Sequence, residues 1–412
     1  MTITSADVTL RKGPWYIGYA PVGKIATLVY DFDHDRYFRN QTIVSINDVL
    51  TTTRASEASY YDSNGVIHFV DANTPRINYN PSTGSCLGLM IEDSSKNYFI
   101  RTEDFNSSYW TKQNSVSITQ DATQSPNHGV SADLISWGSN GSSIYQVVTT
   151  DATATDITIT IYAKPNSNDG LSILLYNWVT FGNIKVLVVN DITTGEAVGN
   201  GFYRHTLSAT ISDGIGWTPG DDVNVYIYPD NNYGYVTSSS YYIWGVQFEQ
   251  RSSPTSYIRQ LSGSKMSNRP AEIHEHVLDS EYVGGGTFMC EYDSNNQFDT
   301  IFEFYASTTN TLKVQGGIIT YTGNNLSTTG TYSNSTINRF SIQFSEDGSL
   351  SYSYNGSLPT TKSGSAMTSS PSTLRIGSTQ TNGNRLNGHV RKIMYYPRQA
   401  NDNRLVRLTN GT

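Results

Sequence analysis

Tyrosine, tryptophan and asparagine side chains gather in two turn-prone segments of the sequence. The first segment is Asp230-Asn-Asn-Tyr-Gly-Tyr235, and the second is Tyr176-Asn-Trp178 with Phe181 nearby. An aromatic ring stacks against the C–H face of a sugar, while amide groups hydrogen-bond to the sugar hydroxyls. Exposed loop residues of these types predict a glycan-binding site. Its candidate members are Tyr233, Tyr235, Asn231, Asn232 and Trp178.

A second interpretation stays open for the aromatic residues next to strands. Tryptophan is highly buried on average, so Trp178 and Tyr176 would then fill the core of a β-sandwich. Packing in cores or at subunit contacts is also the favoured interpretation for four alternating tyrosines, Tyr226, Tyr228, Tyr241 and Tyr242.

Two histidines lie two residues apart in Glu272-Ile-His-Glu-His276. Because side chains alternate along an extended strand, His274 and His276 point the same way, and Glu272 joins them. In a trimer with this strand near the threefold axis, three such pairs would give an octahedral nitrogen site for a transition metal. The competing interpretation is a pair of polar side chains on a solvated face.

Two further motifs resemble sites only in part. Asp31-Phe-Asp-His-Asp35 alternates carboxylates, but Arg36 stands where a calcium loop needs glycine, so a solvated strand edge is favoured. Gly84-Ser-Cys-Leu-Gly88 has the glycine spacing of a nucleophile elbow but follows a polar turn, which favours a structural cysteine. No nucleotide-binding glycine motif is present. We therefore predict no cofactor, with calcium or a transition metal as open alternatives.

The elements that must position these residues are short β-strands. Helical spacing of apolar residues is nearly absent, whereas runs of Val, Ile, Thr, Tyr and Phe alternate with polar residues between turn dipeptides. Clear examples are Ile157–Tyr162, Val223–Tyr228 and Phe340–Phe344. Many short strands at regular spacing predict an all-β chain of tandem antiparallel β-sandwich (jelly-roll) domains.

Polar connectors divide the chain into three parts. Residues 1–91 form a small N-terminal attachment segment with some β-structure, residues 92–262 a first jelly roll, and residues 271–412 a second. At about 150 residues per domain, a length of 412 residues agrees with this division.

Composition excludes several classes of protein. The chain has 27 Lys and Arg against 35 Asp and Glu, a formal net charge of -8, and no basic run, which argues against nucleic-acid binding. No apolar stretch approaches the roughly 18 residues of a membrane helix, and the first twelve residues lack the apolar region of a secretory signal. Two distant cysteines, Cys86 and Cys290, exclude a disulfide scaffold.

Several blocks resemble the tail and virion fibre proteins of bacteriophages. Arg54-Ala-Ser-Glu-Ala-Ser-Tyr-Tyr-Asp-Ser-Asn-Gly65 precedes Thr74-Pro-Arg-Ile-Asn-Tyr-Asn-Pro81 and Gly88-Leu-Met-Ile-Glu92. Glu103-Asp-Phe105 and Trp110 then resemble the start of a jelly roll similar to a carbohydrate-binding module. The closing segments of such a module are similar to Ile243-Trp-Gly-Val-Gln-Phe-Glu249, Thr255-Ser-Tyr-Ile258 and Asn268-Arg-Pro270.

The last part resembles laminin-G and concanavalin-type jelly rolls. The similar segments are Asn338-Arg-Phe-Ser-Ile342, Ser353-Tyr-Asn-Gly356, Leu374-Arg-Ile-Gly377 and Asn387-Gly-His-Val-Arg-Lys-Ile-Met-Tyr-Tyr-Pro-Arg398. Retaining glycosidases of concanavalin type carry Glu-x-Asp-x-x-Glu on one strand. Here Glu291-Tyr-Asp-Ser-Asn-Asn296 ends in an amide, which cannot donate the proton to the leaving group, so we expect no enzyme.

The resemblance implies a phage tail fibre or capsid-attached fibre on the exterior of the virion. Its N-terminal segment would dock on other virion proteins, and a jelly roll would bind a host-surface glycan during adsorption. We expect a homotrimer, because fibres close with cyclic symmetry and subunit contacts cover sheet edges. A purely structural virion protein and a glycan depolymerase are the alternatives.

Overall fold

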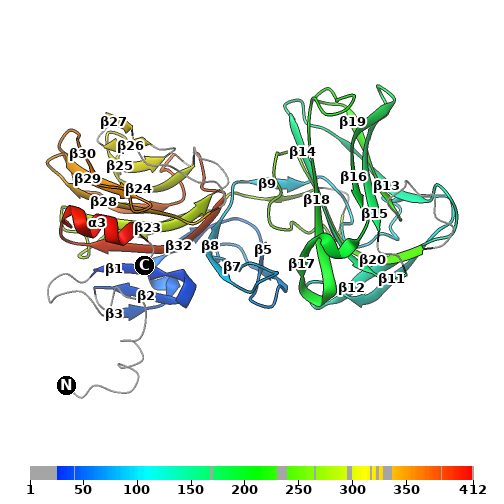
Figure 1. Cartoon of the computed structure of the whole chain (residues 1–412), viewed down its shortest axis with the longest axis horizontal. Coiled ribbons are helices and arrows are strands. Elements are labelled where there is room, and N and C mark those ends of the chain that lie inside the picture. The colour runs from blue at the N-terminus through cyan, green and yellow to red at the C-terminus, as the bar shows by residue number, and fades with distance from the viewer. Residues whose placement is uncertain are drawn as a thin grey trace, which may run out of the picture.

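The structure is a computed structural model that describes residues 26–40, 42–167, 170–229, 239–263, 266–294, 299–315, 318–321, 324–327, 336–381 and 383–410. Residues 1–25, the candidates Asn231, Asn232, Tyr233 and Tyr235, and Asn296 lie outside the described residues. Two antiparallel β-sandwiches lie side by side along the long axis of the molecule, joined by a small β-region (Figure 1). The predicted all-β class with tandem sandwiches is confirmed.

The middle sandwich packs a five-stranded sheet on a six-stranded sheet, in the orders β10-β13-β19-β15-β16 and β11-β12-β20-β14-β18-β17. The five strands of the first sheet are β10 (Thr111–Gln113), β13 (Ser143–Thr149), β15 (Leu171–Asn177), β16 (Gly182–Val189) and β19 (Asp222–Tyr228). The second sheet comprises β11 (Val116–Gln124), β12 (Val130–Trp137), β14 (Asp156–Pro165), β17 (Glu196–Val198), β18 (Phe202–Thr210) and β20 (Ser239–Glu249). Two 3-10 turns accompany them, η2 (Ile192–Thr194) and η3 (Gly199–Gly201).

Alternation along the strands builds the core of this sandwich. Ile157, Ile159 and Ile161 of β14 all point inward and are fully buried. They meet Ile173 and Leu175 of the opposite sheet within one apolar cluster. Burying each such side chain contributes about 1.5–3 kcal/mol, which outweighs the entropy lost on ordering it.

The C-terminal sandwich contains a larger pair of sheets around one apolar cluster. One sheet has the strands β1 (Leu28–Asp31), β2 (Arg36–Arg39), β3 (Thr42–Val44), β7 (Ile77–Tyr79), β8 (Cys86–Ile91), β23 (Gly285–Ser294), β28 (Asn338–Ser345), β29 (Ser349–Tyr354), β30 (Thr360–Ser363) and β32 (Gly388–Tyr396). The other has β4 (Thr51–Thr53), β22 (Ile273–Val277), β24 (Thr300–Ser307), β25 (Asn310–Gln315), β26 (Ile318–Tyr321), β27 (Asn324–Ser327) and β31 (Thr373–Ile376). The helical elements are η1 (Phe32–His34), α2 (Ile46–Val49) and α3 (Asp402–Thr409).

Strands from the start of the chain complete the C-terminal sandwich. β1 pairs with β32, placing Leu28 opposite Tyr395, and β8 also pairs with β32. β4 pairs with β22 in the opposite sheet, with Thr52 opposite His274. The expected boundary at residue 91 therefore separates strands that the structure joins, and the middle sandwich is inserted into the C-terminal one. Local patterns do not show pairings that span more than 200 residues of sequence.

The small β-region between the sandwiches contains two short strand pairs. β5 (Ala58–Tyr61) and β6 (Ile67–Val70) form a hairpin, and β9 (Ser95–Asn97) pairs with β21 (Ser267–Arg269). The β9–β21 pair carries the chain into the middle sandwich and out of it again (Figure 1).

A buried ion network holds these parts together, and we call it the joint network. Glu272 accepts hydrogen bonds from Arg54 Nη1 at 2.7 Å and from Arg76 Nε and Nη2 at 2.9 and 2.6 Å. Glu92 accepts one from Arg76 Nη2 at 2.9 Å and lies 3.3 Å from Arg269 Nη2. The three arginines are 1% exposed each. Burial alone would raise the pKa of Glu272, but the charge and hydrogen bonds of Arg76 lower it to about 2.

No helix in the part of the chain that the structure describes is long and apolar enough to cross a membrane.

Candidate functional site

The two candidate metal-binding histidines lie in the core, not at a surface. His274 and His276 share one face of β22 with Glu272, as alternation predicts, but they are 0% and 1% exposed. His276 Nε2 lies 2.6 Å from Glu281 Oε1, and its Nδ1 lies 2.8 Å from the Tyr30 hydroxyl. A threefold-axis metal site needs both imidazoles at a subunit surface, and the solvated-face interpretation needs them in water. Neither arrangement is present in the structure.

The two motifs that resemble a nucleophile elbow and a calcium loop, Gly84–Gly88 and Asp31–Asp35, have structural roles. Gly88 has φ +101° and lies where an added Cβ would clash with the backbone of Val390 on β32. The half-buried Cys86 thiol donates to the carbonyl of Phe32 at 3.6 Å, and burial raises its pKa above the ordinary value. The Asp31–Asp35 segment forms the end of β1 and the turn η1. Among the described residues, no group of three or more His, Cys, Asp and Glu side chains is arranged to hold a metal ion.

The five-stranded sheet of the middle sandwich presents aromatic rings on its outer side. On β13, Ile144 and Val148 point into the core, so Tyr145 and Val147 point outward. The same alternation sends Val223, Val225 and Ile227 of β19 inward and sends Tyr226 and Tyr228 outward. We define the aromatic face as the outward residues Tyr145, Tyr176, Trp178, Phe181, Tyr226 and Tyr228.

Strand register brings these rings together. Tyr145 lies directly opposite Tyr226 in the β13–β19 pair, with ring centroids 4.7 Å apart. Tyr226 also contacts Tyr176 at 6.5 Å and Tyr228 at 5.9 Å. Trp178 donates a hydrogen bond from Nε1 to the Tyr226 hydroxyl at 3.2 Å, which fixes the orientation of the indole.

The turn between β15 and β16 carries the most exposed part of the aromatic face. Trp178 is 49% exposed and Phe181 is 72% exposed, with ring centroids 6.0 Å apart. Phe181 has φ +54°, a left-handed conformation that is unusual for a bulky residue and costs on the order of 1 kcal/mol. Apart from its contact with Trp178, this ring faces solvent.

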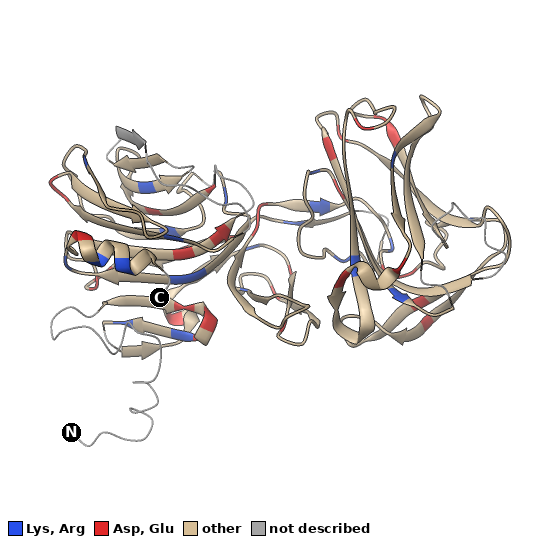
Figure 2. Ribbon diagram, viewed as in Figure 1, with Lys and Arg blue, Asp and Glu red and all other residues tan. Residues whose placement is uncertain are grey.

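The strands that carry the aromatic face have few charges. Among β13, β15, β16 and β19 only Lys185 and Asp222 are charged. Figure 2 accordingly shows these strands almost without blue or red. An uncharged aromatic surface suits the C–H faces and hydroxyls of a neutral sugar chain.

The aromatic face contains some of the residues that the sequence analysis singled out. Trp178 lies on the aromatic face beside Tyr176, and not in the core as the alternative interpretation had it. Tyr241 is fully buried in the core, and Tyr226, which lies among the rings of the aromatic face, is also buried at 5% exposure, whereas Tyr228 is partly exposed. Sequence reasoning missed Tyr145, although alternation along Ser143–Thr149 separates inward Ile144 and Val148 from it.

Comparisons with known proteins find only distant structural matches. No protein-family model and no curated protein sequence matches the chain. The enzymatically active domain of tailspike protein 4 of bacteriophage CBA120 is 14% identical, over 37% of this chain and 21% of that chain, with a TM-score of 0.24. This chain thus spans about a fifth of the tailspike chain.

Two further solved structures cover more of their own length. The CBM22-1 and CBM22-2 tandem domain of Paenibacillus barcinonensis Xyn10C is 10% identical over 75% of this chain and 98% of that chain, with a TM-score of 0.26. Domains LG4-5 of the mouse laminin alpha1 chain are 11% identical over 62% of this chain and 85% of that chain, with a TM-score of 0.21.

Proposed function

We propose that this protein is a virion fibre protein that binds a host-surface glycan through the aromatic face and does not cleave it. The observation that carries the proposal is the exposed pair Trp178 and Phe181 at the end of a connected row of aromatic rings. Large apolar side chains exposed together on one sheet face mark a binding surface. The phage-like sequence blocks support the location on a virion exterior.

The sheet itself makes the aromatic face suitable for recognition. The tyrosines lie on β13, β15 and β19 of a hydrogen-bonded sheet, and a hydrogen bond to Tyr226 holds the indole of Trp178, so little conformational entropy is lost when a ligand binds. Each ring–sugar contact is weak. A homotrimer and several fibres per virion would multiply such contacts through effective concentration. The N-terminal part would attach the fibre to other virion proteins.

The test is binding of the purified full-length protein to intact host cells and to their surface polysaccharide. Trp178→Ala is expected to weaken binding at least tenfold, which corresponds to about 1.4 kcal/mol. The matched control is Tyr305→Ala, which removes a partly exposed tyrosine from β24 of the C-terminal sandwich. Circular dichroism and thermal unfolding verify that both variants fold.

Three outcomes contradict the proposal in different ways. Equal binding by Trp178→Ala and the parent protein places the site elsewhere. Release of new reducing ends from the polysaccharide shows that the protein is a depolymerase. No binding by the parent protein, despite its presence on virions, favours a purely structural role.

A further inference from the structure

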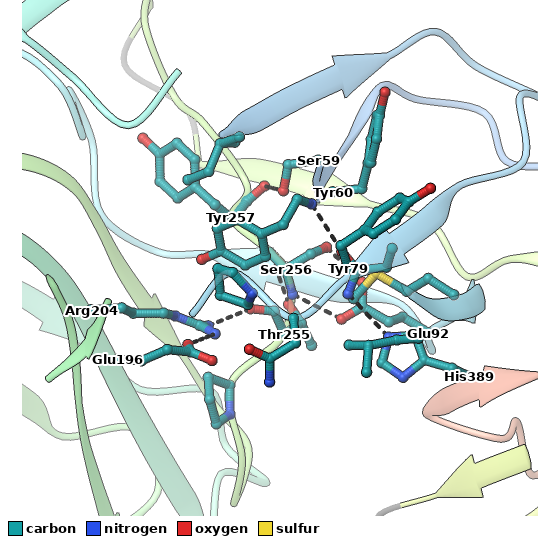
Figure 3. Close-up of a pocket in the computed structure, with 18 of the residues that line it drawn as sticks. Ser59, Tyr60, Tyr79, Glu92, Glu196, Arg204, Thr255, Ser256, Tyr257 and His389 are labelled. Carbon is teal, nitrogen blue, oxygen red and sulfur yellow. Dashed lines mark hydrogen bonds and ion pairs between the residues drawn. The ribbon is translucent and has the colours of Figure 1, made fainter. Parts of the chain in front are cut away.

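A cleft of about 210 Å³ opens where the small β-region, the middle sandwich and the C-terminal sandwich meet. We call it the joint cleft. Figure 3 shows Tyr60 and Tyr79 on one side of it and Arg204 and Glu196 on the other, with His389 of β32 below Tyr79. It lies in a different part of the molecule from the aromatic face, because none of its lining residues belongs to that face.

One wall of the joint cleft offers ring surfaces. Tyr60 and Tyr79 are both partly exposed, on β5 and β7. Tyr60 stacks on His68 of the neighbouring strand β6, with ring centroids 5.4 Å apart, so its orientation is fixed. Half-exposed rings held in this way present faces on which the C–H groups of a sugar ring can stack.

The opposite wall offers charged groups. Arg204 Nη2 donates to the carbonyl of Thr255 at 2.8 Å, and Arg204 Nη1 lies 3.8 Å from Glu196, so this arginine already has a carboxylate beside it. Arg251, in the connector after β20, also lines the cleft and is partly exposed. Within the described residues, Arg251 forms no ion pair, although its charge acts on Asp299, whose pKa it lowers against the larger effect of burial.

The buried charges of the joint network are paired without Arg251. The network pairs Arg54, Arg76 and Arg269 with Glu272 and with Glu92, which itself lines the cleft, and Glu249 adds a third buried carboxylate that accepts hydrogen bonds from Thr255. Arg251 lines the cleft without an ion pair among the described residues, so its guanidinium can pair with a ligand. A guanidinium binds a carboxylate with two parallel hydrogen bonds, which favours an anionic group at this place.

The walls of the joint cleft are fixed before a ligand arrives. Ser256 donates from its backbone nitrogen and its hydroxyl to Glu92 at 2.8 and 2.6 Å. His389 lies between Asp293 and Asn78, with contacts of 3.0 Å on each ring nitrogen. A cleft with such walls loses little entropy on binding.

We propose that the joint cleft is a second sugar site, which binds one sugar residue that carries a carboxylate. Its volume lies below the roughly 300–1,000 Å³ of pockets for drug-sized ligands, so a single ring fits better than a chain. The sugar ring stacks on Tyr60 and Tyr79, and its carboxylate pairs with Arg251. This site is independent of the proposed binding by the aromatic face.

The experiment is a calorimetric titration of the full-length protein with methyl β-glucuronide and, in parallel, with the neutral methyl β-glucoside. We expect the glucuronide to bind at least fivefold more tightly than the glucoside. Arg251→Gln is expected to abolish this preference, and Tyr79→Ala to weaken binding of both sugars. Arg407→Gln, which removes an exposed arginine on α3, is the matched control and keeps the parent affinity.

Three results would overturn the proposal: equal binding of the two sugars, unchanged glucuronide affinity in Arg251→Gln, or no binding of either sugar by the parent protein at millimolar concentration. Arg251→Gln changes the joint cleft and leaves the aromatic face intact, and Trp178→Ala does the reverse, so the two variants test the two proposals separately. Failure of one proposal is therefore distinguishable from failure of the other.

Discussion

The joint network and the aromatic face reverse the usual distribution of side chains. At the joint, Arg54, Arg76 and Glu272 are charged and buried, whereas Trp178 and Phe181 are apolar and exposed. Burying charge is costly unless every partner is present, and exposing rings forgoes hydrophobic stabilisation. The joint network therefore fixes how the parts are arranged, whereas the aromatic face is the surface that we propose for a partner.

Several of the sequence blocks that resemble phage fibres lie at the joint between the parts of the molecule. They supply Arg54, Arg76, Glu92 and Arg269 to the joint network. Residues further along the same blocks are buried as well, such as Trp110 at 2% exposure. None of these blocks contributes a residue to the aromatic face. The resembling blocks therefore lie where the modules are joined, and they also supply Tyr60 and Tyr79 to the joint cleft.

The largest effect is expected from breaking the joint network. Glu272→Ala leaves Arg54 and Arg76 buried without their shared carboxylate, and we expect a loss of about 3–5 kcal/mol in the free energy of unfolding. Urea unfolding followed by tryptophan fluorescence measures it. A loss below 1 kcal/mol would show that the network contributes nothing specific.

Low pH is expected to weaken the joint network and lower the stability of the protein. The folded-state pKa of Glu272 is about 2, below the ordinary 4.5, so its contribution is present above pH 4.5 and is lost as the pH falls toward 2. At about 1.4 kcal/mol per pKa unit the loss amounts to ~3 kcal/mol. Unfolding at a series of pH values checks this. Glu272→Gln should flatten the profile in this window, and an unchanged slope would assign the acid sensitivity to other groups.

An exposed ion pair provides the control for the buried one. Arg259 and Glu57 pair at 2.5 Å, but their side chains are 31% and 42% exposed. We expect Glu57→Gln to cost no more than about 1 kcal/mol by the same urea unfolding, because solvent screens the pair. A cost as large as that of Glu272→Ala would remove burial as the explanation for the difference.

The smallest expected change in the free energy of unfolding is a gain, whereas the changes above are losses. Phe181→Asn places a residue that tolerates φ +54° in the strained turn, and we expect a stabilisation of about 0.5–1 kcal/mol together with weaker glycan binding. Thermal unfolding and polysaccharide binding are measured on the same preparation. Stabilisation without loss of binding would exclude Phe181 from the ligand site.

Alternation predicted the strands but not their surroundings. The predicted strand Ile157–Tyr162 lies within β14, because its inward isoleucines and the turns around it are local properties. Alternation along β19 likewise separates inward Val225 from outward Tyr226, but it does not show which side chains of other strands lie beside Tyr226. Only the register with β13, which places Tyr145 beside Tyr226, defines the aromatic face.

The two candidate metal-binding histidines also show how far a local sequence pattern can predict the structure. Spacing correctly places His274 and His276 on one face of a strand, but whether that face is buried depends on Tyr30 and Glu281, which approach from other elements. The pairing of β1 with β32 depends likewise on residues far apart in sequence. Such contacts form only when the whole chain is folded, so a local pattern does not contain them.

The pairing of Leu28 with Tyr395 also sets an order in time. At roughly 5–20 residues per second, a ribosome needs about 20–70 s to travel from β1 to β32. One edge of β1 pairs with β2 soon after both are made, but its other edge has no partner until β32 emerges. The inserted middle sandwich is complete well before then and can fold while synthesis continues. The exposed edges of β1 and β4 are therefore the part of the nascent chain most in need of protection from aggregation, and the last strands to emerge close the fold.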